Sequence, residues 1–420
     1  MTPRWSELTQ VFAKIGVLSF GGPAAQIAFM QSELVETRKW LRQDDFLRAL
    51  SFCMLLPGPE AMQLATYAGW RLRGVAGGLL AGMLFVGPGA AFIAILAFLY
   101  VQFGTMKLVQ VGFVGVQVCV TIVVVRALIG LASRALPSGT LRIIAACSFA
   151  SLFMLGLPFP LVVLLAGLAG AALVPSTQHD ASQQGQPSPS SALPILGLGG
   201  VLWVAPLVIC AVAGASFLFD LGVFFSQLAI IGFGGAYAIL TYMAQVLVSD
   251  YGWIDTGQMI DALGLAETTP GPLILVTQFV AMIAGHELGG AATAFAAGGM
   301  ALWVTFVPCF IWIFVGAPYI DRLGQYRYVE TALAGISAAV VGVIANLSLW
   351  FAQHVFFEKH QQIDAGFAAL TLPVWNSLSI DAAILAVVAG TLILRLRINL
   401  LLALPVLAAL AIGIDAILTQ

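Results

Sequence analysis

The stretch FGGPAAQIAFM at residues 20–30 recurs as FGGAYAILTYM at residues 233–243, an offset of 213 positions. Further elements align at this offset without a gap: Phe12 with Phe225, Trp40 with Trp253, and Pro57-Gly58-Pro59 with Pro270-Gly271-Pro272. Farther along the chain the offset grows to 220, which pairs Pro88 with Pro308 and Gly115 with Gly335. Self-similarity on this scale indicates an internal duplication.

The composition of the chain is that of a membrane protein. Of the 420 residues, 60% are apolar and only 9% are charged, whereas an average soluble domain has about 25% charged residues. Too few polar side chains remain to cover a surface that faces water. The long apolar stretches are continuous and do not alternate at period two, which favours spanning helices over a β-barrel. We therefore expect an all-α polytopic membrane protein with two homologous repeats.

Each copy offers six candidate spans, some of them short. In the first copy they are residues 11–30, 46–69, 75–101, 108–131, 141–156 and 158–174. In the second copy they are residues 222–243, 259–284, 291–317, 328–352, 379–394 and 398–418. One more apolar run, residues 195–216, has no counterpart. A single extra crossing between two six-span repeats turns the second upside down, so we expect an inverted repeat of the kind that many secondary transporters use.

One long polar segment, PSTQHDASQQGQPSPSSA at residues 175–192, divides the chain near its middle. It is rich in Ser, Gln and Pro, which predicts a flexible connection. The predicted organisation is a first transporter repeat at 1–174, a polar linker at 175–194, a connecting transmembrane helix at 195–216 and a second transporter repeat at 217–420.

Charge is divided unequally between the copies. The net charge is +6 over residues 1–174 and −7 over residues 195–420. An anion would be drawn to the first copy, although loop charges that are set by topology would give the same count. With the N-terminus in the cytoplasm, the second copy obeys the positive-inside rule, and the first copy is nearly uninformative.

The paired Phe-Gly-Gly and Pro-Gly-Pro motifs lie inside apolar runs and should break their helices. Proline removes a backbone donor, and glycine costs about 1 kcal/mol relative to alanine inside a helix. In lipid an unwound stretch survives only where protein packs around it or where it lines a wet cavity. A broken helix offers free N–H groups and the positive end of its dipole, which bind oxyanions. The alternative is that Gly and Pro merely let helices pack closely.

The candidate substrate-binding residues are those of the breaks and the polar residues near them. They are Lys14, Gly21, Gly22, Pro23, Pro57, Gly58, Pro59, Gln63, Arg126, Gly234, Gly235, Thr268, Thr269, Pro270, Gly271 and Pro272. Glu60 and Glu267 lie beside the Pro-Gly-Pro motifs and are candidates for carrying a coupling proton, with helix capping as the alternative. Lys14 would attract the anion or extend to the membrane interface. Arg126 is the basic residue with the most hydrophobic sequence around it.

Motifs for chemical conversion are absent from the sequence. No G-x-x-x-x-G-K-[ST] loop is present, so ATP bound to this chain is not the driving force. The five cysteines are scattered singly, and no His-rich or paired-acid motif predicts a metal site. We therefore expect no catalytic residue, no metal, no cofactor and no nucleic-acid partner. Transport without chemical conversion is the simpler interpretation.

The elements F-G-G-P-x-x-x-I-x-x-M at residues 20–30, Trp40-Leu41, Pro57-Gly58-Pro59 and their echoes in the second copy resemble the chromate ion transporter family in its long, two-domain form. The resemblance implies efflux of chromate and chromate resistance at the inner membrane of bacteria, with sulfate as a close structural analogue of chromate. The alternatives are a sulfate uptake transporter and a passive anion channel. The expected partners are the chromate or sulfate dianion, membrane lipid and a second copy of the chain in a homodimer. Ala236 stands where the first copy has Pro23, so the two copies should contribute unequally.

Overall fold

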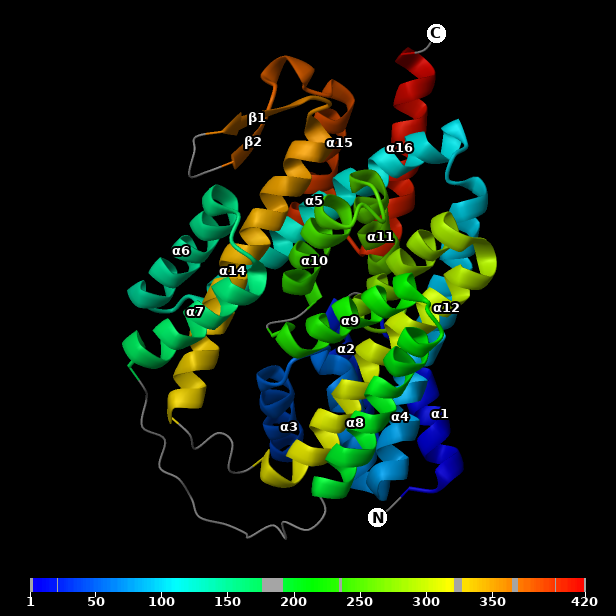
Figure 1. The fold of residues 1–420 in the computed structure, drawn as a ribbon, viewed down its shortest axis with the longest axis vertical. Helices are drawn as coiled ribbons and strands as arrows, with labels where there is room; N and C mark the ends of the chain where they lie inside the picture. Colours follow the sequence, from blue (N-terminus) through cyan, green and yellow to red (C-terminus); the bar gives the residue numbers. More distant parts are fainter. Residues whose placement is uncertain are drawn as a thin grey trace. The chain divides into compact units, whose positions relative to one another are not determined.

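The computed structural model describes residues 3–20, 22–175, 192–233, 236–320, 327–364, 369–396 and 398–418. The first copy forms α1 (Trp5–Leu18), α2 (Gly22–Gln31), the π-helical turn η1 (Ser32–Thr37), α3 (Gln43–Leu55), α4 (Glu60–Phe103), α5 (Lys107–Ala135), α6 (Gly139–Leu155) and α7 (Phe159–Leu173). Helix α8 (Ala192–Val212) follows the polar segment. Figure 1 shows this helical chain in the colours of the sequence.

The second copy repeats this order of elements. It forms α9 (Ser216–Ile231), α10 (Ala236–Ala244), η3 (Gln245–Asp250), α11 (Thr256–Glu267), η4 (Leu273–Leu275), α12 (Val276–Gly316), η5 (Ala317–Tyr319), α14 (Arg327–Phe356), η6 (Trp375–Ser377), α15 (Ile380–Gly390), η7 (Thr391–Arg395) and α16 (Leu400–Leu418). An antiparallel hairpin, β1 (His360–Asp364) and β2 (Ala369–Pro373), lies between α14 and η6. The sequence analysis did not expect this hairpin.

The duplication is visible in local structure. The π-helical turns η1 and η3 begin and end 213 positions apart. The same offset relates the chain reversals that follow them, where Lys39 has φ 55° and Gly252 has φ 59°. Such turns are rare inside α-helices, so their recurrence at one offset is a structural trace of a copied sequence. The prediction of a largely helical chain with two repeats is confirmed; the inversion of the second repeat stays a prediction.

The predicted helix breaks are present in both copies. Helix α1 ends at Leu18 and α2 begins at Gly22; α3 ends at Leu55 and α4 begins at Glu60. In the second copy α9 ends at Ile231, and α11 ends at Glu267. Six helices in the described residues are long and apolar enough to cross a membrane, among them α8. Several other helices are shorter, because Gly and Pro interrupt their apolar runs.

Two of the long helices turn back on themselves. In α4, Gly74 has φ 64°, and in α12 the equivalent Gly290 has φ 73°. The two arms of α4 pack closely beyond this turn, because a Cβ built on Gly69 would lie only 2.3 Å from the Gly77 carbonyl oxygen. The expected spans 46–69 and 75–101 are thus linked by a tight helical turn with no loop between them.

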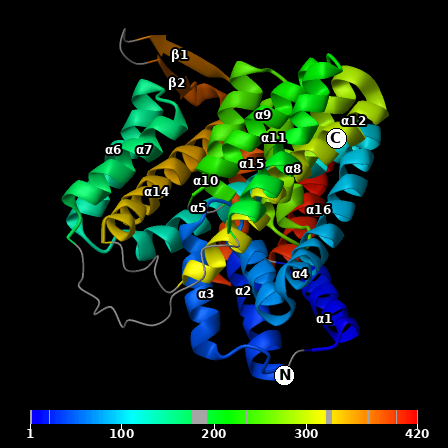
Figure 2. The same ribbon diagram turned by 60° about the horizontal axis from the view of Figure 1, so that its bottom comes forward.

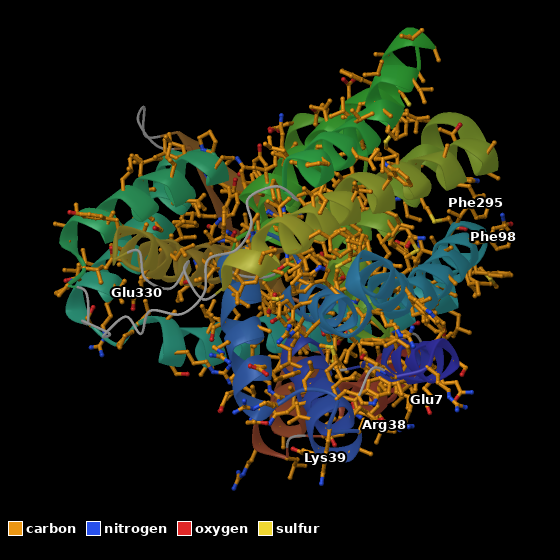
Figure 3. The ribbon with its side chains drawn as sticks, turned by 90° about the horizontal axis from the view of Figure 1, so that it is seen from below. Glu7, Arg38, Lys39, Phe98, Phe295 and Glu330 are labelled. Carbon is orange, nitrogen blue, oxygen red and sulfur yellow. The ribbon has the colours of Figure 1, made fainter. Side chains whose placement is uncertain are left out.

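The chain forms two compact units, each assembled from parts of both copies. The first unit comprises Met1–Phe98, Thr177–Ala236 and Thr269–Arg327. Within it α12 packs against α8 and α9, as both ribbon views show (Figures 1 and 2). Many large apolar side chains of this unit are exposed, including Phe98 of α4 and Phe295 of α12, which project outward in Figure 3. A surface of this kind suits contact with lipid acyl chains.

The second unit comprises Leu99–Ser176, Tyr237–Thr268 and Tyr328–Gln420. In this unit α5 packs against α11, α15 and α16. Helices α7 and α14 approach through glycines, since a Cβ on Gly170 would lie 2.4 Å from the Thr331 carbonyl oxygen and 2.8 Å from Gly335 Cα. Small residues at such crossings let helices pack without a hydrophobic driving force.

Candidate functional site

The helix breaks of the two copies are joined by a reciprocal pair of backbone hydrogen bonds. The N–H of Gly58, in the first Pro-Gly-Pro, donates to the carbonyl oxygen of Gly232 at 3.0 Å. The N–H of Gly271, in the second Pro-Gly-Pro, donates to the carbonyl oxygen of Ser19 at 2.9 Å. Both donors and both acceptors are related by the offset of 213. We call Ser19, Gly58, Gly232 and Gly271 the reciprocal clasp, and all four lie in the first unit.

Both donor positions of the reciprocal clasp require glycine. Gly58 has φ 112° and Gly271 has φ 87°, a region that L side chains rarely adopt. A Cβ on Gly58 would also lie 2.8 Å from the Sγ of Cys309. The equivalent contact in the other copy joins Gly271 to Gly89, since a Cβ on Gly271 would lie 3.6 Å from the Gly89 Cα. The two breaks are therefore enclosed by protein on the same plan.

Two buried glutamines hold the backbone at the breaks. Gln26 donates from Nε2 to the carbonyl oxygen of Gly271 at 2.6 Å and to that of Ser19 at 3.4 Å. Gln63 donates from Nε2 to the carbonyl oxygen of Pro57 at 2.7 Å. The Oε1 atoms of both glutamines and the Oγ of Ser19 have no partner among the described protein atoms. Buried polar atoms of this kind call for water or for a polar ligand.

Gln26 was missed by the sequence analysis. The only signal for it was a polar residue three positions after Pro23 in an otherwise apolar run. Its partner Gly271 is distant in sequence, so no local pattern indicated the contact.

The start of α4 presents backbone N–H groups beside the first Pro-Gly-Pro. Because α4 begins at Glu60, the N–H groups of its first turn have no acceptor inside the helix. Pro59 provides the acceptor for the first helical bond, from the Gln63 N–H at 3.0 Å. The half-buried Glu60 occupies the positive end of the helix dipole. An anion would be favoured at the same place, so the Glu60 carboxylate and an anion would compete there.

Lys14 forms an ion pair inside the first unit. Its Nζ contacts the Oε1 of Glu33 and lies 5.8 Å from the centre of the Phe29 ring. The Glu33 side chain is only 10% exposed, whereas that of Lys14 is 50% exposed. The ammonium group of Lys14 therefore contacts the Glu33 carboxylate of η1 and is still exposed enough to meet a further anion.

The second unit contains the other candidate acid and the candidate arginine. Glu267, at the end of α11, is buried and accepts a hydrogen bond of 2.5 Å from the Tyr237 hydroxyl. Thr268 donates from its hydroxyl to the Leu265 carbonyl oxygen at 2.6 Å, which is a helix-capping contact. Arg126 is exposed on α5.

The remaining candidate residues are buried, half-buried or outside the residues that the structure describes. Gly21, Gly234 and Gly235 lie outside the described residues. Pro59, Thr269, Pro270 and Pro272 are buried, and Gly22, Pro23 and Pro57 are half-buried. Gly22 begins α2 with φ 80°. The first unit thus brings together Pro57–Gln63 with Thr269–Pro272, whereas Arg126, Glu267 and Thr268 lie in the second unit.

Duplicated helices, span-length apolar segments and paired breaks define a multi-pass α-helical membrane protein built from two repeats. A family profile described as "Chromate transporter" matches residues 6–171 and again residues 219–414. The chain therefore belongs to the chromate transporter family.

Similar proteins carry matching names. The chain is 31% identical to a "Chromate transport protein" of Pseudomonas aeruginosa over 91% of this chain and 90% of the relative. It is 28% identical to a "Chromate transport protein" of Cupriavidus metallidurans, over 81% of this chain and 80% of the relative. It is 27% identical to a "Probable chromate transport protein" of Synechococcus elongatus, over 81% and 82%. No solved structure matches the chain.

Proposed function

We propose that this chain is a secondary transporter that moves chromate out of the cell across the cytoplasmic membrane and so confers chromate resistance. The observation that carries the proposal is the reciprocal clasp. Two enclosed, unwound backbone segments, one from each repeat, meet in a membrane protein whose family is the chromate transporter family. Interrupted segments at matching positions of two repeats are where secondary transporters bind their substrates.

The groups around the first break suit a tetrahedral oxyanion. Backbone N–H groups at the start of α4 and the dipole of that helix attract negative charge without requiring a buried cation. The Ser19 hydroxyl has no partner among the described atoms and is able to donate to an anion oxygen. Lys14 adds a positive charge on the same unit and is half exposed. Glu60 and Glu267 are the proposed proton-coupling acids, because both lie next to a break.

The membrane potential is sufficient to drive export. Moving one elementary charge through 100 mV is worth about 2.3 kcal/mol, so a dianion that leaves a negative interior gains about 4.6 kcal/mol. Exchange for an entering proton would add to this energy. Sulfate uptake runs against the same potential and would need several co-transported cations. Export of the dianion therefore needs fewer coupled ions than its uptake does.

Flux into membrane vesicles tests the proposal. Everted and right-side-out vesicles that contain the protein are loaded with buffer, and the entry of labelled chromate and labelled sulfate is followed. A membrane potential or a pH gradient is imposed separately. The proposed exporter accumulates chromate in everted vesicles when the lumen is positive or acidic, and prefers chromate to sulfate. Vesicles from cells without the protein provide the background.

Three results would count against the proposal. Preferential sulfate accumulation in right-side-out vesicles would support the uptake transporter instead. Equal fluxes in both orientations that never exceed equilibrium would support a passive anion channel. No chromate flux above background would reject chromate as the substrate. Cross-linking in the same vesicles would test the expected homodimer.

A further inference from the structure

A buried carboxylate lies away from the helix breaks, in the second unit. Asp261, in α11, is only 6% exposed. Its Oδ1 accepts a hydrogen bond from the Gln117 Nε2 of α5, and its Oδ2 accepts one from the Tyr100 hydroxyl near the end of α4, both at 2.8 Å. We call Tyr100, Gln117 and Asp261 the Asp261 cluster. All three residues belong to the second unit.

The described surroundings of Asp261 contain no neutralising cation. None of the ion pairs among the described residues includes Asp261, and Lys107, at the start of α5, lies 3.8 Å from Asp415 of α16. The groups that face Asp261 are the neutral Gln117 of α5 and Tyr100 of α4. The other carboxylates of this helix are Asp255, its N-cap, and Glu267, its last residue. Asp261 therefore differs from Glu33, which is paired with Lys14.

The cluster is able to hold Asp261 with or without a proton. Burial in a membrane protein opposes the charged form of the carboxylate. Two hydrogen-bond donors favour the ionised form. When Oδ2 takes up a proton, the Tyr100 hydroxyl can rotate and accept from it, while Gln117 continues to donate to Oδ1. The carboxyl group of Asp261 thus keeps both of its hydrogen-bond partners in either state.

We propose that Asp261 is a proton-binding site of the transport cycle, which takes up one proton and releases it on the opposite side of the membrane as the anion moves the other way. This inference rests on the proposed function. No bond other than the O–H bond of Asp261 forms or breaks in this step. The first repeat has Arg48, an exposed residue, at the equivalent position. The proton site at Asp261 therefore has no counterpart at the equivalent position of the first repeat.

Asp261 is well placed to separate proton binding from anion binding. It precedes Glu267 by six residues on α11, a distance of about 9 Å along the helix at 1.5 Å per residue. Glu60 and Glu267 adjoin the breaks, so replacing either one would alter the anion site as well. Replacing Asp261 should remove the response to a proton gradient and leave anion translocation in place.

The test uses the full chain in everted vesicles, with labelled chromate as the probe. In one arm the membrane potential is clamped at zero and the lumen is made acidic; in a second arm a potential is imposed at equal pH; in a third arm chromate is exchanged for chromate without any gradient. We expect Asp261→Asn to lower the chromate flux driven by the pH gradient at least tenfold. In the other two arms its chromate flux should fall less than twofold. Asp220→Asn, the same change at an exposed aspartate of α9, should behave as the unchanged protein.

The outcomes distinguish this inference from the proposed function. If Asp261→Asn follows the pH gradient as well as the unchanged protein does, Asp261 does not carry the proton. If the unchanged protein responds to potential but never to pH, the inference fails and chromate transport stands. If no arm shows chromate flux, the proposed function fails.

An infrared measurement reads proton binding without any transport. The purified protein should show a protonated-carboxyl band that disappears as pH rises, and Asp261→Asn should lack that component. An unchanged band in the variant would overturn the proposal independently of flux.

Discussion

Gly271 donates its backbone N–H to the carbonyl oxygen of Ser19 at 2.9 Å, and so closes a break in one repeat with a residue of the other. The equivalent bond from Gly58 to Gly232 runs in the opposite sense between the repeats. An unpaired backbone group in an apolar interior costs several kcal/mol, so each break depends on the other repeat for its stability. Both repeats are therefore needed to form the site as well as the fold.

The first prediction concerns Gly58. Replacing it by alanine forces an L residue to φ 112° and places a Cβ 2.8 Å from the Cys309 Sγ. Backbone strain of this kind costs about 1–3 kcal/mol. We expect Gly58→Ala to lower chromate flux at least tenfold and Gly58→Leu to abolish it, while both proteins still insert into the membrane. Flux per inserted protein, measured in everted vesicles, checks this.

Gly87 is the matched control for Gly58. It lies in α4, outside the left-handed region, and a Cβ there would meet nothing within 4 Å. Gly87→Ala should keep normal flux and normal thermal stability. Full activity of Gly58→Leu would show that the first break is not part of the transport site.

The second prediction concerns Gln26. Replacing it by leucine removes the donor that holds the Gly271 and Ser19 carbonyl oxygens in a buried place. Leaving such a group unsatisfied costs about 1–3 kcal/mol. We expect Gln26→Leu to lower the unfolding temperature of the purified protein and to reduce flux, whereas Gln110→Leu, at an exposed position of α5, should do neither. An unchanged unfolding temperature would mean that water replaces the lost donor.

The architecture was accessible from the sequence because it depends on local and periodic signals. Apolar runs longer than a bilayer predict spanning helices, and the repeated Phe-Gly-Gly and Pro-Gly-Pro motifs fixed the register of the copies and the positions of the breaks. Each break appeared where Gly and Pro exclude regular helix. The β1–β2 hairpin was not foreseen, because residues 360–373 carry no strong turn motif and lie between apolar runs.

The contacts of the site were accessible only in part. Pro57–Pro59 and 270–272 were singled out as candidates, but nothing local indicated that Gly58 would bond to Gly232 or that Gln26 would reach Gly271. Lys14 was expected near the anion, whereas its pairing with Glu33 depends on the π-helical turn η1. Asp261 was not selected, since no motif surrounds it. Long-range pairing of buried polar groups follows from tertiary packing, which a single sequence does not specify.

The third prediction concerns the ion pair of Lys14 and Glu33. If Lys14 attracts the anion, Glu33→Gln frees its charge and should lower the KM for chromate, whereas Lys14→Met should raise the KM. The two groups are in contact, so their effects should not add, with a coupling energy of about 1 kcal/mol. A double-mutant cycle on chromate flux measures this coupling. Additive effects on KM would show that the pair does not act on the anion.

The fourth prediction concerns Glu60 at the beginning of α4. Its carboxylate occupies the helix end that we assign to the anion, so Glu60→Gln should tighten chromate binding most strongly at high pH, where the unchanged residue is ionised. A like charge about 6 Å away at an effective dielectric constant of about 20 costs close to 3 kcal/mol, which allows a tenfold or larger gain in affinity. Chromate binding to the purified protein, measured across pH, checks this. Glu36→Gln, at an exposed position of η1, is the control and should leave binding unchanged. If Glu60→Gln binds chromate more weakly at every pH, the carboxyl group contacts the anion as a donor and does not compete with it.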